Sequence, residues 1–430
     1  MKHIVYQVLP RLWGRGGFSE WDTPAFDYLK TLGVDCVWYT GIPRHATGQP
    51  FVKGDPGSPY SVTDWKDVNP YLADDPGDRM GEFRALVDRT HAAGLKVIID
   101  YIPNHVARDY SGPVRHFDYC DGDWTDTLKN DWSAAETREA MADILRFWAA
   151  LGVDGFRCDM VELVPADALR ELFAELRRDY PGMIFIAEVY GRDNYRMYLE
   201  DVGFDLLYDK SGLYDRLRAV CGYRMPAREL TWNWQWLGDM QPRMLNFLEN
   251  HDEQRLASPE FLGDAHKGFA PLAFSLLFNT ASFMLYFGQE IGVNAEEGAC
   301  GRTSIFEWKR PAAVDRLVRY IHSGKGLGRE ERSLLSRYRE LLGYAVKPVF
   351  AEGSVWDLCY CNYDSAGFDP ERHFAFVRYD DTHAFLVVCN FSSAPAGIAV
   401  RIPPEIEGIC GCSTIDVSVA PFDATILRMR

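Results

Sequence analysis

The chain contains 430 residues, of which 46 are basic and 62 acidic, so its net charge is −16 at pH 7. A strongly negative protein is repelled by polyanions, which argues against nucleic acid and against an anionic membrane as the main partner. Hydrophobic residues make up 47% of the chain, enough for a sizeable core. We therefore expect a globular protein that binds a neutral ligand.

Short apolar runs recur along the first part of the chain, and amphipathic helical patterns such as GEFRALVDRTHAAG separate them. The eight runs that we expect to form strands are IVYQVL at 4–9, VDCVWY at 34–39, KVIID at 96–100, VDGFRCD at 153–159, MIFIAE at 183–188, FDLLYD at 204–209, MLNFLE at 244–249 and SFMLYF at 282–287. Strands that alternate with helices form parallel sheets. Eight such units predict an α/β fold, a (β/α)8 TIM barrel, over residues 1–346.

The longest uncharged run, residues 268–289, has about the length of a membrane span but contains Pro271 and Asn279. We expect a buried helix followed by a strand there. The first residues, MKHIVYQVLP, enter a strand pattern without the features of a signal peptide, and the ten cysteines form no C-x-x-C pair. We therefore expect a cytoplasmic protein with reduced thiols, although a trimmed secreted form would begin in the same way.

From Pro348 onward the chain alternates apolar and polar residues in HFAFVRY, HAFLVVCNFS, AGIAVRI and STIDVSV, with turn residues between them. This pattern predicts a small antiparallel β-sandwich domain over residues 347–430. Its aromatic residues Trp356, Tyr360 and Phe385 follow the alternation expected of core positions.

Polar side chains gather where the expected barrel strands end, which is the end of such a barrel that carries the active site. Asp100, Asn104 and His105 follow the third strand, Arg157 and Asp159 end the fourth, Glu188 ends the fifth, and Asn250, His251 and Asp252 follow the seventh. Three carboxylates, those of Asp159, Glu188 and Asp252, are thus expected to converge. A metal site and acid/base chemistry are the two interpretations of such a cluster.

The neighbours of the carboxylates favour acid/base chemistry. Arg157 and Asp159 lie two residues apart and share one face of a strand, so the arginine would hold the carboxylate ionised, as a nucleophile requires. Glu188 follows the apolar run MIFIA, and partial burial would raise its pKa toward that of a general acid. These are the two carboxyl groups of a retaining glycosidase, which lie roughly 5 Å apart.

Four motifs carry a resemblance to a known family. DYIPNHV, GFRCD, AEVYG and FLENHD, in this order, resemble the four signature regions of the α-amylase family, glycoside hydrolase family 13. SPYSVTDWKDVNP and FGQEIG are further matches, and the resemblance extends over essentially the whole chain. It implies that Asp159 is the nucleophile and that Glu188 is the acid and then the base.

The resemblance also implies roles for the residues around this pair. Asp252 would bind hydroxyls of the distorted sugar, and His105 and His251 would contact the same ring. Tyr60 would supply the stacking platform. Arg157 would orient Asp159, Asp100 would support Arg157, and Asn104 would lie behind the residues that touch the sugar.

Two departures from the family pattern stand out. Many members have a Lys-His pair three and four residues after the nucleophile, whereas this chain has Glu162 and Leu163, so contacts on the leaving-group side must differ. The insertion at 106–133 is short. A calcium ion held by Asn104 and one of Asp118, Asp121 or Asp131 is an alternative that we do not favour, and we expect no cofactor to be required.

The resulting function hypothesis is a retaining hydrolase of α-1,4-glucosidic bonds in starch, glycogen or maltodextrins. A glucanotransferase, or an exo-acting maltogenic enzyme or α-glucosidase, would use the same catalytic residues, and the Glu162–Leu163 departure motivates this alternative. A glucan-binding protein without activity is disfavoured by the intact carboxylates. No phosphate-binding or dinucleotide-binding fingerprint occurs in the sequence.

Overall fold

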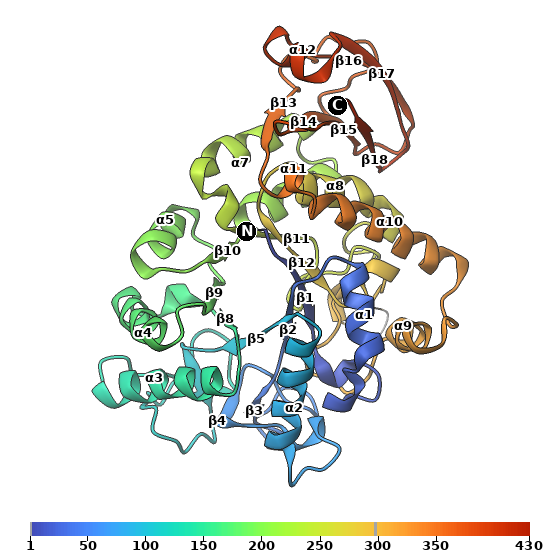
Figure 1. Ribbon diagram of the computed structural model, residues 1–430. Coiled ribbons are helices and arrows are strands. Elements are labelled where there is room, and N and C mark those ends of the chain that lie inside the picture. Colours follow the sequence, from blue (N-terminus) through green and yellow to red (C-terminus); the bar gives the residue numbers. More distant parts are fainter. Residues whose placement is uncertain (1, 296–298) are drawn as a thin grey trace.

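The computed structural model describes residues 2–295 and 299–430, and its first part is a closed barrel of parallel strands (Figure 1). The barrel strands are β1 (Ile4–Val8), β2 (Cys36–Tyr39), β5 (Lys96–Tyr101), β8 (Gly155–Cys158), β9 (Ile184–Ala187), β10 (Leu206–Tyr208), β11 (Met244–Phe247) and β12 (Ser282–Tyr286). Each strand pairs in parallel with the next along the chain, and β12 closes on β1. The eight expected strands and the TIM-barrel fold are confirmed.

Helices surround the barrel (Figure 1). They are α1 (Thr23–Thr31), α2 (Arg79–Ala92), α3 (Ala135–Ala150), α4 (Ala166–Asp179), α5 (Tyr195–Met197), α6 (Asp215–Cys221), α7 (Leu230–Leu237), α8 (Phe269–Leu277), α9 (Ala312–Ser323) and α10 (Arg329–Ala345). In α4 the apolar residues Leu169, Leu172, Phe173 and Leu176 recur at helical spacing and are buried, so this face packs on the barrel. The uncharged run forms the buried α8 and then β12, as expected. Among the described residues no helix has the length and hydropathy needed to cross a membrane.

Alternation along the strands decides which side chains point into the barrel. Trp38, Ile98, Ile186 and Leu245 belong to one apolar cluster inside it, whereas Phe156 and its outward neighbours pack against the helices. Because side chains alternate with a period of two residues, every second residue up to the end of each strand also points into the barrel. Charged residues at these ends therefore enter the barrel mouth rather than the helical layer.

Two antiparallel hairpins extend from the barrel. β6 (His105–Ala107) and β7 (Thr127–Lys129) form the short insertion after β5. β3 (Pro43–His45) and β4 (Val62–Val68) form a second hairpin after β2, which the sequence analysis did not predict. Its first strand has three residues and begins with proline, so it gives almost no strand pattern.

The C-terminal part contains antiparallel sheets, as expected. β13 (Ser354–Asp357), β14 (His373–Tyr379), β15 (Ala384–Asn390) and β18 (Ala424–Arg428) form one sheet in this order, and β16 (Ala396–Arg401) pairs with β17 (Thr414–Val419). Two short helices, α11 (Pro348–Ala351) and α12 (Pro404–Cys410), complete this part. The domain boundary between 346 and 347 stays a prediction; it lies between α10 and α11.

One expectation about the C-terminal part is wrong. Phe385 is buried, but the side chain of Tyr360 is 55% exposed and Trp356 is only partly buried. β13 lies at the edge of its sheet, so aromatic residues on it and just after it reach the surface. All ten cysteines belong to the described residues, and none forms a disulfide.

Candidate active site

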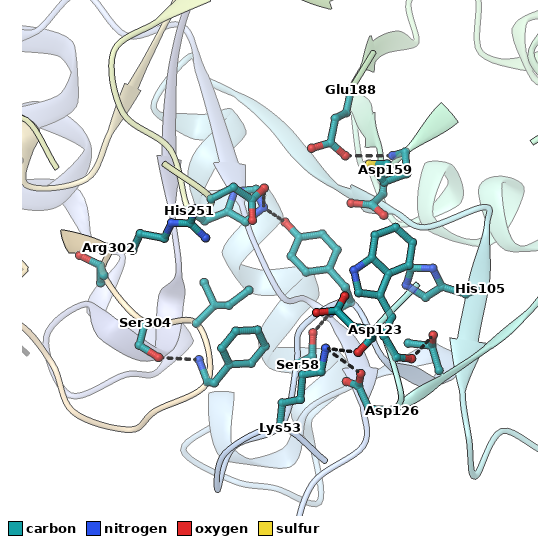
Figure 2. Close-up of a pocket in the computed structure, with 18 of the residues that line it drawn as sticks. Lys53, Ser58, His105, Asp123, Asp126, Asp159, Glu188, His251, Arg302 and Ser304 are labelled. Carbon is teal, nitrogen blue, oxygen red and sulfur yellow. Dashed lines mark hydrogen bonds and ion pairs between the residues drawn. The ribbon is translucent and has the colours of Figure 1, made fainter. Parts of the chain in front are cut away.

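Six of the expected site residues line a cavity of about 590 Å³ at the carboxyl ends of the barrel strands (Figure 2). Asp159, Glu188 and Asp252 all face this cavity, so the three carboxylates converge as the sequence predicted. Tyr60, His105 and His251 line it as well. Asp159 and Glu188 follow the neighbouring strands β8 and β9, and Asp252 follows β11.

Arg157 links the carboxylates from inside the barrel. Its side chain is fully buried; Nη1 donates to Asp159 Oδ1 at 2.6 Å, and Nη2 forms an ion pair with Glu188 Oε1 at 2.8 Å. Asp100 Oδ1 lies 3.6 Å from Nη1. Three carboxyl groups thus surround the buried arginine and compensate its desolvation. The geometry agrees with the expectation that Arg157 orients Asp159.

Glu188 is placed as a buried acid. Its Oε2 accepts a hydrogen bond from the Met160 backbone N–H at 2.9 Å, and its Oε1 accepts one from the Tyr190 hydroxyl at 2.9 Å. Burial raises the pKa of Glu188 to about 8 against the lowering effect of Arg157, and the charges of Asp159 and Asp252 raise it further. A carboxyl group with this pKa carries a proton at neutral pH, as a general acid must.

His251 is held in one orientation by its neighbours. The Gln7 amide donates to Nδ1 at 2.8 Å, and the opposite nitrogen, Nε2, lies 2.6 Å from the Tyr60 hydroxyl and 3.1 Å from Asp252 Oδ2. Burial, with a contribution from Arg157, keeps the pKa of His251 well below its ordinary value. The ring is therefore neutral, and the Gln7 contact assigns its N–H to Nε2, on the side of the cavity.

Tyr60 and Asp100 connect this histidine to Arg157. The Tyr60 ring stacks on His251 with centroids 5.2 Å apart, and its hydroxyl donates to Asp100 Oδ1 at 3.3 Å. Asp100 also accepts from Trp38 Nε1 at 3.1 Å. Burial raises the pKa of Asp100 to about 7, although Arg157 lowers it. Asp100 lies behind the cavity wall, in agreement with a supporting position.

Asn104 takes part in an ionic contact within the insertion. Its Nδ2 donates to Asp121 Oδ2 at 2.9 Å, and the Lys129 ammonium lies 3.0 and 2.9 Å from the two oxygens of the same carboxylate. The pKa of Asp121 is lowered because these two donors outweigh the effect of burial. Calcium prefers six to eight oxygen ligands. A carboxylate already neutralised by an ammonium group does not fit that set.

The other two carboxylates considered for calcium do not join Asn104. Asp131 Oδ1 accepts from the backbone and hydroxyl groups of Ser133, and Asp118 is exposed. The Asn104 side-chain oxygen is buried and has no hydrogen-bond partner among the described residues.

The sequence analysis missed several residues of the site. No partner for Glu162 could be inferred from the sequence; its carboxylate accepts from the Tyr190 N–H at 2.8 Å and from the Gly191 N–H at 3.1 Å. It therefore holds the loop that carries Tyr190 beside Glu188. Gln7 was missed too, although the alternation of β1 points it inward. Tyr190 was also missed, although its position two residues after Glu188 could have marked it as a residue of the site.

A second wall of the cavity comes from loops that no motif marked. Lys53 Nζ donates to the Asp123 carbonyl at 3.1 Å and lies 3.6 Å from Asp126 Oδ1 (Figure 2). The neighbouring Gly54 has φ +67°, and a Cβ atom there would lie 1.9 Å from the Phe306 carbonyl oxygen. Three loops, around residues 53, 123 and 306, are therefore packed together at this wall.

Comparisons with known proteins agree with the motifs. The family model described as "Alpha amylase, catalytic domain" matches residues 23–126. Alpha-amylase MalA of Haloarcula japonica is 26% identical over 477 residues, which cover 99% of this chain and 62% of that protein. The chain thus spans about three fifths of the length of this relative.

Solved structures show the same fold. A maltogenic α-amylase from Thermotoga neapolitana superposes with a TM-score of 0.74 at 24% identity, covering 99% of this chain and 96% of that one. An α-amylase from Lactobacillus plantarum superposes with a TM-score of 0.76 at 19% identity, covering 99% and 98%. In its barrel and in these matches the chain is similar to proteins of the α-amylase family.

Proposed function

We propose that this protein is a retaining glycoside hydrolase of the α-amylase type, which cleaves α-1,4-glucosidic bonds in starch, glycogen or maltodextrins. The observation that carries the proposal is the contact of one buried arginine with both Asp159 and Glu188. It holds two carboxyl groups at one cavity, while burial raises the pKa of Glu188 to about 8. Two carboxyl groups at one cavity, of which Glu188 carries a proton at neutral pH, suit a retaining glycosidase.

The first step forms a covalent intermediate. An Asp159 oxygen attacks the anomeric carbon while Glu188 gives its proton to the glycosidic oxygen, so the carbon–oxygen bond to the leaving sugar breaks. In the second step Glu188, now ionised, takes a proton from water, and the water oxygen displaces Asp159 from the anomeric carbon. The proton returned to Glu188 restores the starting state.

The remaining site residues bind the sugar. Asp252 exposes 45% of its side chain and faces the cavity, where it can accept hydrogen bonds from hydroxyl groups of the reacting sugar. His251 and His105 line the cavity, where their rings can contact the same sugar, and Tyr60 lines it beside them. Such contacts favour a distorted sugar ring over the relaxed one.

A neutral glucan also suits the charge of the protein, since a chain of net charge −16 repels anionic substrates. The ten unpaired thiols support a reducing compartment, and we propose the cytoplasm.

A specific observation favours a second candidate, an exo-acting maltogenic enzyme or α-glucosidase. Lys53 joins two loops across one wall of the cavity through Asp123 and Asp126. A wall closed in this way restricts how far a chain can extend past the reacting sugar. Cleavage near a chain end would follow, with the same catalytic residues.

We further propose that activity does not require calcium. The Lys129 ammonium forms an ion pair with the Asp121 carboxylate beside Asn104, where the family resemblance would place a calcium ion. Lys129 lies on β7, opposite His105 of β6 in the hairpin register. The ammonium contact thus braces the hairpin that carries one of the cavity residues.

Incubation with maltoheptaose tests the function. The wild type should release shorter maltodextrins, and Asp159→Asn, which keeps the size of the side chain, should release none. A single short product from the start would favour the exo-acting candidate, and products longer than maltoheptaose would favour a glucanotransferase. Turnover by Asp159→Asn equal to that of the wild type would contradict the proposal, and absence of turnover by both would favour a protein that binds glucan without cleaving it.

A further inference from the structure

A second large cavity, of about 730 Å³, lies between the barrel and the C-terminal sheet. Its barrel side comes from α7 and from Pro242 and Thr280, which precede β11 and β12. Its other side is the edge strand β13, which Figure 1 shows beside α7. Because these barrel residues precede their strands, the groove lies at the end of the barrel opposite to Asp159 and Glu188.

Aromatic rings line this groove, which we call the α7–β13 groove. Tyr360 is 55% exposed and Tyr363 48% exposed, while Trp356 and Trp234 are partly buried. Trp356 Nε1 donates to the Tyr360 hydroxyl at 3.3 Å, so these two rings are held together. A cluster of exposed aromatic rings on a protein surface commonly marks a binding site. Flat rings with polar tips suit a ligand that is apolar on its faces and polar at its edges.

The charged groups of the groove are already engaged within the chain. Asp239 pairs with Arg196 at 2.7 Å, and Asp357 accepts from the Thr231 hydroxyl and from the Cys359 N–H. Arg378 is buried, and its guanidinium donates to backbone carbonyls.

The neutral groups of the groove remain available to a ligand. The lining includes the exposed side chains of Gln235 and Ser354 and the partly exposed hydroxyl of Thr280. Amide and hydroxyl groups donate and accept hydrogen bonds without a charge. The groove therefore offers rings and neutral polar groups, which is the chemistry of a site for an uncharged polyhydroxyl ligand.

We propose that the α7–β13 groove binds a segment of an α-glucan chain, separately from the catalytic cavity. The identity of this ligand rests on the proposed function, because the same polymer would supply both sites. The groove holds no acid–base pair of its own, so its role is to keep a long chain on the enzyme. Arg378 fixes the sheet to the barrel by donating to the Phe278 carbonyl at 3.1 Å and to the Gly353 carbonyl at 2.7 Å, so the two walls of the groove are preorganised.

Affinity electrophoresis in gels that contain glycogen, run on the whole protein, tests the proposal. The double variant Trp356→Ala/Tyr360→Ala removes two rings of the groove. Tyr223→Ala is the matched control, since Tyr223 is 51% exposed and lies outside the groove. The dissociation constant for glycogen should rise about tenfold in the double variant, the equivalent of about 1.4 kcal/mol, and stay unchanged in the control. The kcat/KM for maltoheptaose should stay within about twofold of wild type in both.

Three results would overturn the proposal: no retardation of the wild type by glycogen, equal retardation of the wild type and the double variant, or an equal loss in Tyr223→Ala. Failure of the proposed function is seen separately, as the absence of maltoheptaose turnover by the wild type. A groove that binds glycogen in a protein without that turnover would keep the inference and reject the catalytic account.

Discussion

The Tyr190 hydroxyl contacts Glu188, the proposed acid, and should affect the pH range over which this residue can act. It donates to Glu188 Oε1 at 2.9 Å, and such a bond is stronger when the carboxyl group is ionised. Tyr190→Phe removes this donor and keeps the ring. The pKa of Glu188 should therefore rise above the wild-type value of about 8, which burial already sets.

The size of the change follows from the bond. A hydrogen bond to a charged group contributes about 1.5–3 kcal/mol, and about 1.4 kcal/mol corresponds to one pH unit of pKa. Because Tyr190 faces the open cavity, water will replace part of the lost bond. We therefore expect the pKa to rise by about one pH unit, from about 8 to about 9.

The assay is kcat/KM for maltoheptaose between pH 5 and pH 10, which reports the pKa values of the free enzyme. Activity needs protonated Glu188, so the wild-type rate should fall as pH rises through about 8. In Tyr190→Phe this fall should lie about one pH unit higher. Tyr195→Phe is the control, since its hydroxyl bonds Asp209 at 3.5 Å rather than Glu188. A fall at the wild-type pH, or at lower pH, would refute the reasoning.

Four further predictions follow from the site. Glu188→Gln should lower kcat about 10²–10⁴-fold with an unchanged melting temperature. A loss of less than about tenfold would show that Glu188 is not the general acid. Lys129→Met should lower the free energy of unfolding by about 1 kcal/mol, because it leaves the Asp121 carboxylate without its ammonium partner. A chelator should change neither the wild-type melting temperature nor its rate; a drop in either would show that a metal is needed. Lys53→Met should remove the contact with Asp126 at the cavity wall and increase internal cuts in maltoheptaose. A product pattern identical to that of the wild type would show that Lys53 does not favour cleavage near chain ends.

The barrel and the convergence of the candidate catalytic residues at its mouth could be predicted because their signals are local. Strand periodicity sets the direction of Arg157, Asp159 and Glu188, and the rule that barrel sites lie at strand ends then brings them together. The same reasoning placed Asp252 and His251. The structure adds the contacts of Arg157 with three carboxylates, which join strands far apart in the chain.

The missed features depend on contacts between distant segments. Nothing in the sequence distinguishes Lys129 and Lys53 from other lysines. Their positions at the site become evident only from their ion pairs with Asp121 and Asp126 in the folded chain. Likewise, alternation placed Tyr360 in a core, whereas the edge position of β13 exposes it. Periodicity cannot distinguish an edge strand from a central one, because that depends on which strands pair.

The central claim is that Asp159 and Glu188 act as a retaining pair. Proton NMR of the first products formed from maltoheptaose tests it most directly, because the anomeric signal appears before mutarotation. The account predicts new reducing ends in the α configuration for the wild type and no product for Asp159→Asn. A first product in the β configuration would contradict it, since that outcome requires direct attack by water instead of a covalent intermediate on Asp159.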